Sequence, residues 1–199
     1  MVPVLHSIAD PRLAVLLMGG QVGVIPTDTI YGLALRASDP EAVARLARLK
    51  EGGEHYKPGT IIAASARQLI DLGVDEAIIR SVEHLWPNPL SLELPIGKKL
   101  AYLYQDGPHR AFRVVADPVL QLLLEKTGPL LTSSVNPHGQ PQANTIDEAR
   151  HYFGDRVDFY VDGGDLSDRP PSTVARVRDG RIEVLRQGAV TIDKKGNIL

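Results

Sequence analysis

Hydrophobic and polar positions alternate along the chain with two different periods. Short apolar, β-branched runs predict strands, and stretches whose apolar residues recur every three or four positions predict amphipathic helices. The predicted strands lie at 22–25, 60–64, 90–94, 102–104, 112–115, 129–132, 157–161, 173–178 and 181–185. The predicted helices lie at 40–50, from 66 onward, and at 75–85, 118–126 and 146–153. This order indicates an α/β protein with a twisted mixed sheet, and it is not the regular alternation of a dinucleotide-binding fold.

Capping residues place the ends of several of these elements. Asp-Pro pairs at 39–40 and 117–118 each offer a carboxylate cap followed by a proline that the first helical turn tolerates. Ser65 caps the next helix, and Thr145 with Glu148 three positions later is typical of a capping box. An Asp-Gly pair joins the last two predicted strands and indicates a tight hairpin.

Composition excludes several kinds of chemistry. The chain has 199 residues, a hydrophobic content of 43% and no cysteine. This length is typical of one α/β domain, so residues 1–199 are expected to form a single domain. The missing thiols exclude disulfides, thiolate metal sites and cysteine nucleophiles, and the six histidines lack the paired spacing of a zinc hydrolase. We therefore expect no protein-bound metal.

The chain also lacks the features of a membrane or secreted protein. No apolar run approaches the roughly 20 residues that a membrane span needs. The first ten residues do not combine a basic start with an apolar core, as a secretory signal would. We therefore expect a cytoplasmic protein that makes no membrane contact.

Charge is unevenly distributed along the chain. The 24 acidic residues nearly balance the 22 Lys and Arg, for a net charge of −2. From 169 to 199, however, there are seven basic residues and three acidic ones, so this tail carries +4 and the remainder −6. Two interpretations stay open: a solvated strand surface, or a cationic strip that meets a phosphate or a polyanion.

Four polar clusters follow predicted strand or helix ends. They lie at 26–33, at 50–58, at 132–139, and at 171–174 together with 185–188. Ligand sites in α/β sheets are found at such ends, and hydroxyls, amides and cations are suited to an anionic ligand. The first cluster is equally compatible with a capped turn, and Lys50 is also favoured at a helix C-terminus by the helix dipole. The standard phosphate-binding loops are absent from the sequence.

Taken in order, six strings within and beside these clusters resemble one family. They are Pro-Thr-Asp-Thr-Ile-Tyr-Gly-Leu at 26–33, Trp-Pro-Asn-Pro-Leu at 86–90, Phe-Arg-Val at 112–114, Ser-Val-Asn-Pro at 134–137, Pro-Ser-Thr-Val at 171–174 and Leu-Arg-Gln-Gly at 185–188. The chain resembles the YrdC-like threonylcarbamoyl-AMP synthases from about residue 19 to 190. One such string is weak evidence, whereas all six in the same order are highly specific.

The resemblance implies a fold and an activity. The fold is an open, twisted α/β sheet with helices and a large concave, positively lined cavity. The activity is that of a nucleotidyltransferase, which condenses L-threonine, bicarbonate and ATP into threonylcarbamoyl-adenylate and releases pyrophosphate. A partner complex then passes the threonylcarbamoyl group to tRNA, and such domains are also credited with binding double-stranded RNA. ATP is a substrate here, and Mg²⁺ bound mainly to its phosphates is the expected cofactor.

The resemblance also assigns residues to each substrate. On the threonine side it places Thr27, Thr29, Arg113, Ser134 and Ser172. On the ATP side it places Lys50, Asn136, Asn144 and Arg186. The planar fork of Arg113 suits a carboxylate. No side chain is assigned as a nucleophile, because joining two anions requires positioning and positive charge instead.

One departure from the family pattern leaves a second function open. The family's Lys-x-Arg motif stands here as Lys50-Glu51-Gly52, so the Arg is missing. With the +4 tail, this is compatible with a divergent relative that binds double-stranded RNA or a nucleotide without synthase activity. Such a protein would bind structured RNA with an affinity that falls steeply as salt rises.

Overall fold

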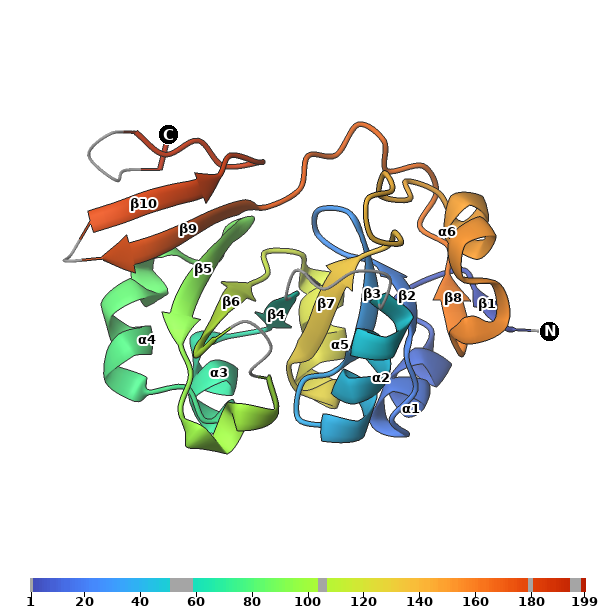
Figure 1. Ribbon diagram of the computed structural model, residues 1–199, viewed down its shortest axis with the longest axis horizontal. Coiled ribbons are helices and arrows are strands. Elements are labelled where there is room, and N and C mark those ends of the chain that lie inside the picture. Colours follow the sequence, from blue (N-terminus) through green and yellow to red (C-terminus); the bar gives the residue numbers. More distant parts are fainter. Residues whose placement is uncertain (1, 51–58, 104–106, 179–180, 194–197) are drawn as a thin grey trace.

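The computed structural model describes residues 2–50, 59–103, 107–178, 181–193 and 198–199. Ten strands of the described residues form one sheet in the order β1-β8-β2-β3-β7-β4-β6-β5-β9-β10 (Figure 1). They are β1 (Val4–Leu5), β2 (Gly23–Pro26), β3 (Tyr31–Arg36), β4 (Thr60–Ala63), β5 (Leu90–Pro95), β6 (His109–Val114), β7 (Leu130–Ser134), β8 (Phe159–Val161), β9 (Thr173–Arg178) and β10 (Arg181–Arg186). The sheet is mixed, because β2 pairs in parallel with β8 and antiparallel with β3. The predicted mixed α/β sheet is therefore confirmed.

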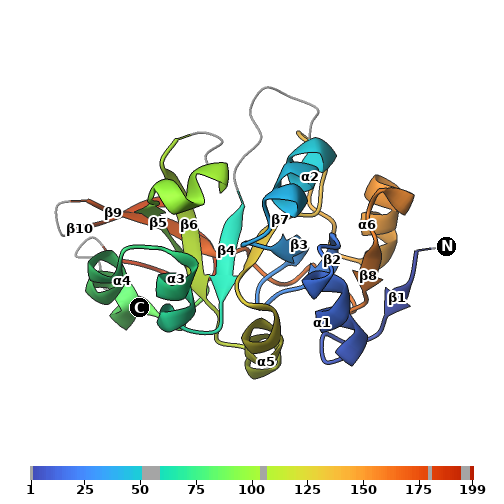
Figure 2. The same ribbon diagram turned by 90° about the horizontal axis from the view of Figure 1, so that it is seen from below.

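Helices cover both faces of this sheet. They are α1 (Pro11–Met18), α2 (Pro40–Lys50), α3 (Ala66–Leu72), α4 (Glu76–Val82), α5 (Pro118–Thr127) and α6 (Ile146–Phe153), with short 3₁₀ turns η1 (Glu83–Leu85), η2 (Lys98–Leu103) and η3 (Gly154–Arg156). Figure 2 shows α2 and α6 on one side and α1, α3, α4 and α5 on the other. In the described part of the chain, no helix has the length and apolar character to cross a bilayer.

The capping residues act as the sequence predicts. Asp117 accepts the amide of Leu120 at 2.8 Å, and Ser65 accepts that of Gln68 at 3.3 Å. The capping box of α6 is only half formed. The hydroxyl of Thr145 accepts the Glu148 amide at 3.3 Å, but the Glu148 carboxylate accepts the amide of Asn144 instead of Thr145.

The predicted strand at 102–104 is wrong. Residues Lys98–Leu103 form the 3₁₀ turn η2, and residue 104 lies outside the described residues. Tyr102 donates its hydroxyl to the carbonyl of Ala37 at 2.8 Å, and Leu103 is buried. These tertiary contacts override the β propensity of the aromatic residues.

Three elements were not predicted from the pattern: the two-residue strand β1, helix α1 and strand β3. Helix α1 begins after Asp10, whose carboxylate accepts the Arg12 amide at 2.9 Å, so a third Asp-Pro pair marks its start. Strand β3 begins at Tyr31, inside the string assigned to a polar cluster. Its first five residues are all buried, so the strand lacks the alternation by which a half-exposed strand is recognised.

The strand pairings bring the polar clusters to one end of the sheet. Gly32 of β3 pairs with Ser134 of β7, while Ile62 of β4 pairs with Arg113 of β6. Leu90 of β5 pairs with Thr173, directly after Ser172. In Figure 1 the segment 162–172 passes across the top of the sheet from β8 to β9.

Asp158 joins helix α2 to the start of β2, and its loss is expected to destabilise the fold. Its carboxylate accepts the amide of fully buried Val22 at 2.8 Å and both terminal nitrogens of Arg45. Asp158→Ala leaves that amide unpaired, so we expect the free energy of unfolding to fall by about 2 kcal/mol in urea denaturation. The control is Asp71→Ala, which breaks only the exposed pair with Arg67 and should leave the midpoint unchanged. Equal losses in the two variants would contradict this assignment.

Candidate functional site

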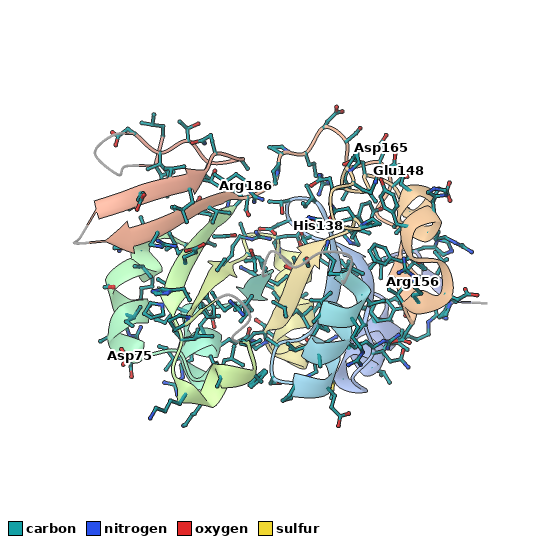
Figure 3. All side chains as sticks on the ribbon, in the orientation of Figure 1. Asp75, His138, Glu148, Arg156, Asp165 and Arg186 are labelled. Atoms are coloured by element: carbon teal, nitrogen blue, oxygen red, sulfur yellow. The ribbon has the colours of Figure 1, made fainter. Side chains whose placement is uncertain are left out.

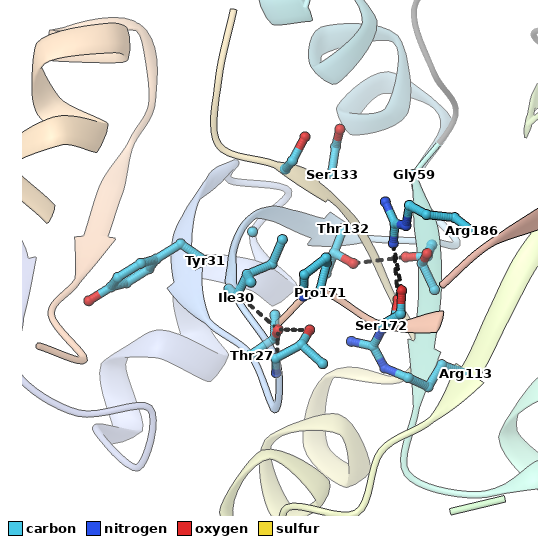
Figure 4. A pocket seen from close by; sticks show the side chains of 14 residues that line it. Thr27, Ile30, Tyr31, Gly59, Arg113, Thr132, Ser133, Pro171, Ser172 and Arg186 are labelled. Atoms are coloured by element: carbon cyan, nitrogen blue, oxygen red, sulfur yellow. Dashed lines mark hydrogen bonds between the residues drawn. The ribbon is translucent and has the colours of Figure 1, made fainter. Parts of the chain in front are cut away.

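A pocket at the upper end of the sheet collects residues from six segments (Figure 4). Its volume is about 140 Å³, roughly ten times what one water molecule needs. It is lined by Thr27, Thr29, Ile30, Tyr31, Gly32, Gly59, Thr60, Arg113, Thr132, Ser133, Ser134, Pro171, Ser172 and Arg186. Hydroxyls and two guanidinium groups dominate the lining, which suits a small polar anion. We call this cavity the arginine pocket.

The loop between β2 and β3 forms one wall of the arginine pocket. The hydroxyl of Thr27 donates to the carbonyl of Ile30 at 2.7 Å and accepts the amide of Thr29 at 3.2 Å. It also lies 3.1 Å from the hydroxyl of Thr29, which must be the donor because the Thr27 proton is already used. Thr27 therefore has no capacity left for a ligand, whereas the Thr29 oxygen keeps its lone pairs as acceptors.

Arg113 lies on a second wall, in an ion pair with Asp28. Its Nη2 donates to Asp28 Oδ1 at 2.8 Å, and its Nη1 donates to the hydroxyl of Ser91 at 3.3 Å. The two charged side chains are only 4% and 7% exposed. Neither Arg113 Nε nor Asp28 Oδ2 has a hydrogen-bond partner. Buried polar atoms are usually satisfied, so this ion pair is unusual in leaving one donor and one acceptor unpaired.

Ser172 connects Arg113 to Arg186. Its hydroxyl lies 3.0 Å from that of Ser91, and Arg186 Nη2 donates to its carbonyl at 2.8 Å. Desolvation, followed by the nearby charge of Arg113, lowers the pKa of Arg186 from its ordinary value. Two guanidinium groups thus line the arginine pocket, and one of them is paired with the Asp28 carboxylate, so the three charges sum to +1.

A second pocket lies beside the first, and we call it the lysine pocket. It has a volume of about 340 Å³ and is lined by Lys50, Ser133, Ser134, Asn136, His138, Gly139 and Gln140. Ser133 and Ser134 line both cavities, so the arginine and lysine pockets share a wall. Figure 3 shows Arg186 of the first pocket and His138 of the second toward the upper end of the sheet.

Lys50 is buried in the wall of the lysine pocket. Its Nζ donates to the carbonyls of Ser134 at 2.8 Å and of Asn136 at 2.6 Å, and to Asn136 Oδ1 at 3.0 Å. Because these partners are neutral, burial lowers the pKa of Lys50 from 10.5 to about 8. The same Oδ1 accepts the hydroxyl of Ser134 at 2.7 Å, which orients the Asn136 amide.

The structure groups some of the predicted residues and separates others. All five residues predicted on the threonine side line the arginine pocket. The predicted ATP set is divided, because Arg186 lines that pocket while Lys50 and Asn136 line the lysine pocket. Asn144 lines neither, and instead borders a surface pocket next to α6 with Glu148 and His151. Gly52 and the rest of 51–58 lie outside the described residues.

Asp28, Ser91 and Ser133 are among the residues of the site to which the sequence assigned no individual role. Asp28 lies between the two threonines of the first string, so the sequence alone places it in the same loop as Thr27 and Thr29. Its partner Arg113, however, is 85 positions away and is reached only through the sheet. Ser91 lies within a short strand-like run that does not mark it as a site residue, whereas Ser133 falls within the polar cluster at 132–139.

A mixed α/β sheet with a hydroxyl- and arginine-lined pocket at one end defines the class of this protein. The family described as "Telomere recombination", which groups Sua5, YciO and YrdC, matches residues 15–188. A Marinobacter nauticus protein named threonylcarbamoyl-AMP synthase is 33% identical, with 82% of this chain and 88% of that protein covered. This chain belongs to the Sua5/YciO/YrdC family.

Solved structures agree with this membership. P. abyssi Sua5 complexed with L-threonine is 25% identical, has a TM-score of 0.79 and covers 96% of this chain. This chain spans only 58% of that Sua5 chain. E. coli YciO is 24% identical with a TM-score of 0.76, and the match covers 94% of this chain and 95% of YciO. The likeness to YciO shows the fold alone.

Proposed function

We propose that this chain is a threonylcarbamoyl-AMP synthase, which forms threonylcarbamoyl-adenylate from L-threonine, bicarbonate and ATP. The observation that carries the proposal is the arginine pocket itself. It gathers all five residues predicted for threonine, Arg113 among them, together with the guanidinium group of Arg186. The named relatives and the threonine complex of Sua5 support the same activity.

In this proposal the arginine pocket holds threonine. The carboxylate of threonine meets the guanidinium groups of Arg113 and Arg186, which both line the pocket. The Thr29 hydroxyl oxygen, which keeps its lone pairs, accepts the side-chain hydroxyl of threonine. The pocket thus fixes the amino acid by charge at one end and by a hydroxyl at the other.

The lysine pocket holds the phosphates of ATP. Phosphate oxygens that reach Lys50 replace one of the three protein oxygens that its ammonium now contacts. The shared wall of Ser133 and Ser134 then marks where the two substrates meet. The amino group of threonine condenses with bicarbonate to a carbamate, with loss of water. A carbamate oxygen then attacks the α-phosphorus, and pyrophosphate leaves. The protein contributes positioning and positive charge to this step, as a nucleotidyltransferase of this kind requires.

Magnesium fits this arrangement only as a companion of the phosphates. Among the described residues, no three His, Asp or Glu side chains are grouped so that they could hold a metal ion. The triphosphate and water would therefore supply the ligands of Mg²⁺, which is its usual way of binding at nucleotide sites. The ion would neutralise phosphate charge, and the roles of the side chains do not depend on it.

The same proposal includes the later steps. The adenylate is passed to a threonylcarbamoyl-transfer complex for tRNA modification, in the cytoplasm, and the protein also binds tRNA or other double-stranded RNA. Within the +4 tail, Arg186 faces the arginine pocket and Arg176 is paired with Glu93 at 3.0 Å, so neither is a free surface charge. The single-domain arrangement of 1–199 is part of the proposal.

Substrate dependence tests the function directly. Purified protein with ATP and magnesium should release pyrophosphate only when threonine and bicarbonate are both present. Pyrophosphate release that ignores threonine, or no release by correctly folded protein, would contradict the proposal. If the protein has no synthase turnover but binds structured RNA with an affinity that falls as salt rises, it is instead the divergent relative without synthase activity.

The buried ammonium of Lys50 predicts a pH dependence for ATP. The charged form attracts phosphate, and the pKa of Lys50 is about 8 without ligand, so the charge is present below pH 8 and is lost above it. We expect the KM for ATP to rise about tenfold between pH 7 and pH 9.5. Lys50→Arg should keep its charge over this range and flatten the profile. The same rise in wild type and in Lys50→Arg would rule out this role.

A further inference from the structure

Ser91 is a buried residue that lies behind the arginine pocket without lining it. It belongs to β5, has no exposed surface, and contacts two residues that do line the pocket. Its Oγ accepts a hydrogen bond from Nη1 of Arg113 at 3.3 Å and lies 3.0 Å from Oγ of Ser172. Because a ligand in the pocket does not reach Ser91, any influence of Ser91 on the reaction passes through these two neighbours.

The contacts of Ser91 determine the direction of its hydrogen bond with Ser172. Arg113 can only donate, so it occupies a lone pair of Ser91 Oγ and offers no acceptor to the Ser91 proton. Among the residues that the structure describes, the Ser172 hydroxyl is the acceptor within reach of that proton. The opposite direction would leave a fully buried O–H group without a partner, which is costly. Ser91 is therefore the donor and Ser172 the acceptor.

This direction leaves the proton of Ser172 available to a ligand. Ser172 Oγ accepts from Ser91 and also lies 3.5 Å from Nη2 of Arg186, so both of its lone pairs face donors. Ser172 lines the arginine pocket beside Arg186, and its proton has no acceptor within the described part of the chain. A ligand that fits this point brings an acceptor, as a carboxylate does. The Thr29 hydroxyl on another wall is arranged in the opposite way, because its proton is used and its lone pairs are open.

We propose that Ser91 is a positioning residue that orients the Ser172 hydroxyl as a hydrogen-bond donor to the carboxylate of the substrate. Ser91 touches no substrate atom and acts through its hydrogen bond to Ser172. With Ser91 in place, the Ser172 proton is directed into the pocket before the ligand arrives, so no hydroxyl has to reorient on binding. This inference rests on the proposed function and adds a buried residue to the recognition of the threonine carboxylate.

A double-mutant cycle tests whether Ser91 acts through Ser172. Isothermal titration calorimetry measures the Kd of L-threonine for wild type, Ser91→Ala, Ser172→Ala and the protein with both substitutions. We expect the Kd to rise about tenfold in Ser172→Ala and about fivefold in Ser91→Ala. When Ser172 is already Ala, Ser91→Ala should change the Kd by less than about twofold, because the hydroxyl that Ser91 orients is gone.

Two further variants are the controls of this cycle. Ser91→Thr keeps the hydroxyl, so its Kd should lie within about threefold of the wild-type value. Thr127→Val removes a different buried hydroxyl, which bonds to the carbonyls of Leu123 and Gly128 and does not line the pocket. It should leave the Kd of threonine unchanged. Thermal melting of every variant shows that the proteins compared are folded.

A purely structural role for Ser91 would give a different result. If Ser91 only supports Arg113, Ser91→Ala raises the Kd by the same factor with and without the Ser172 hydroxyl, and the proposal is overturned. Neutron diffraction from deuterated wild-type protein is a second test that requires no variant. It should place the Ser91 deuteron between the two serine oxygens, and a Ser172 deuteron directed at Ser91 would overturn the proposal. A wild-type protein that does not bind threonine contradicts both the proposed function and this inference, whereas threonine binding with equal factors in the cycle contradicts the inference alone.

Discussion

Arg113→Lys is expected to lower kcat/KM for threonine by roughly 30- to 150-fold, while the protein still folds. The lysine keeps a positive charge beside Asp28, so the buried carboxylate is not left alone. Its compact ammonium lacks the planar fork by which the guanidinium reaches Ser91 and Asp28 from two separate nitrogens while it lines the pocket. The loss of one or two charge-assisted hydrogen bonds corresponds to about 2–3 kcal/mol of transition-state stabilisation.

Arg176→Lys is the matched control for this variant. Arg176 also contacts a carboxylate, that of Glu93, through Nε and Nη2, but it lies outside the arginine pocket. The same substitution there should leave kcat/KM within twofold of the wild-type value. Steady-state kinetics at varied threonine concentration measures both variants. If Arg113→Lys retains its kcat/KM within threefold, Arg113 does not bind the threonine carboxylate.

Gly188→Ala is expected to lower threonine-dependent activity about 100-fold. A Cβ at this position would lie 2.3 Å from the carbonyl oxygen of Pro171 and 2.5 Å from the carbonyl carbon of Ser172. Both atoms belong to the backbone, so the segment that carries Ser172 into the arginine pocket must move. Displacements of about 1 Å in a reaction site commonly reduce rates by this factor. The overpacking should also lower the free energy of unfolding by about 1–3 kcal/mol.

Gly97→Ala separates this effect from the general effect of replacing a glycine. Nothing lies within 4 Å of a Cβ at Gly97. Its activity and melting temperature should therefore match those of the wild type. Calorimetry measures the stability of the Gly188→Ala and Gly97→Ala variants, and the pyrophosphate assay measures their activity. Unchanged activity in Gly188→Ala would mean that the position of Ser172 is irrelevant to the reaction.

Local signals in the sequence were sufficient for much of the fold. Helix α2 and the caps at Ser65 and Asp117 follow from short-range hydrogen bonds, which depend only on residues three or four positions apart. Strand β3 was missed because it is buried along its length and lacks alternation. Tyr102 and Leu103 were misassigned to a strand because their conformation depends on tertiary contacts, such as the bond from Tyr102 to the distant carbonyl of Ala37.

In the candidate site, too, local strings predict some residues, whereas contacts between distant segments could not be predicted. The strings that resemble the family locate Thr29, Arg113 and Ser172, and the strand pairings bring them to the arginine pocket. The pairing of Arg113 with Asp28 depends on the fold, so no local pattern predicts it. Nor does the sequence reveal that the Thr27 hydroxyl forms its hydrogen bonds with residues of its own loop.

The most direct test of the account is the identity of the product. Protein incubated with ATP, magnesium, L-threonine and ¹³C-bicarbonate is quenched, and the nucleotides are analysed by mass spectrometry. The account predicts an adenylate that contains threonine and one ¹³C atom, and that is missing when either threonine or bicarbonate is omitted. An adenylate without the label, or AMP and pyrophosphate formed without threonine, would contradict the claim that this pocket joins threonine and bicarbonate to the α-phosphate of ATP.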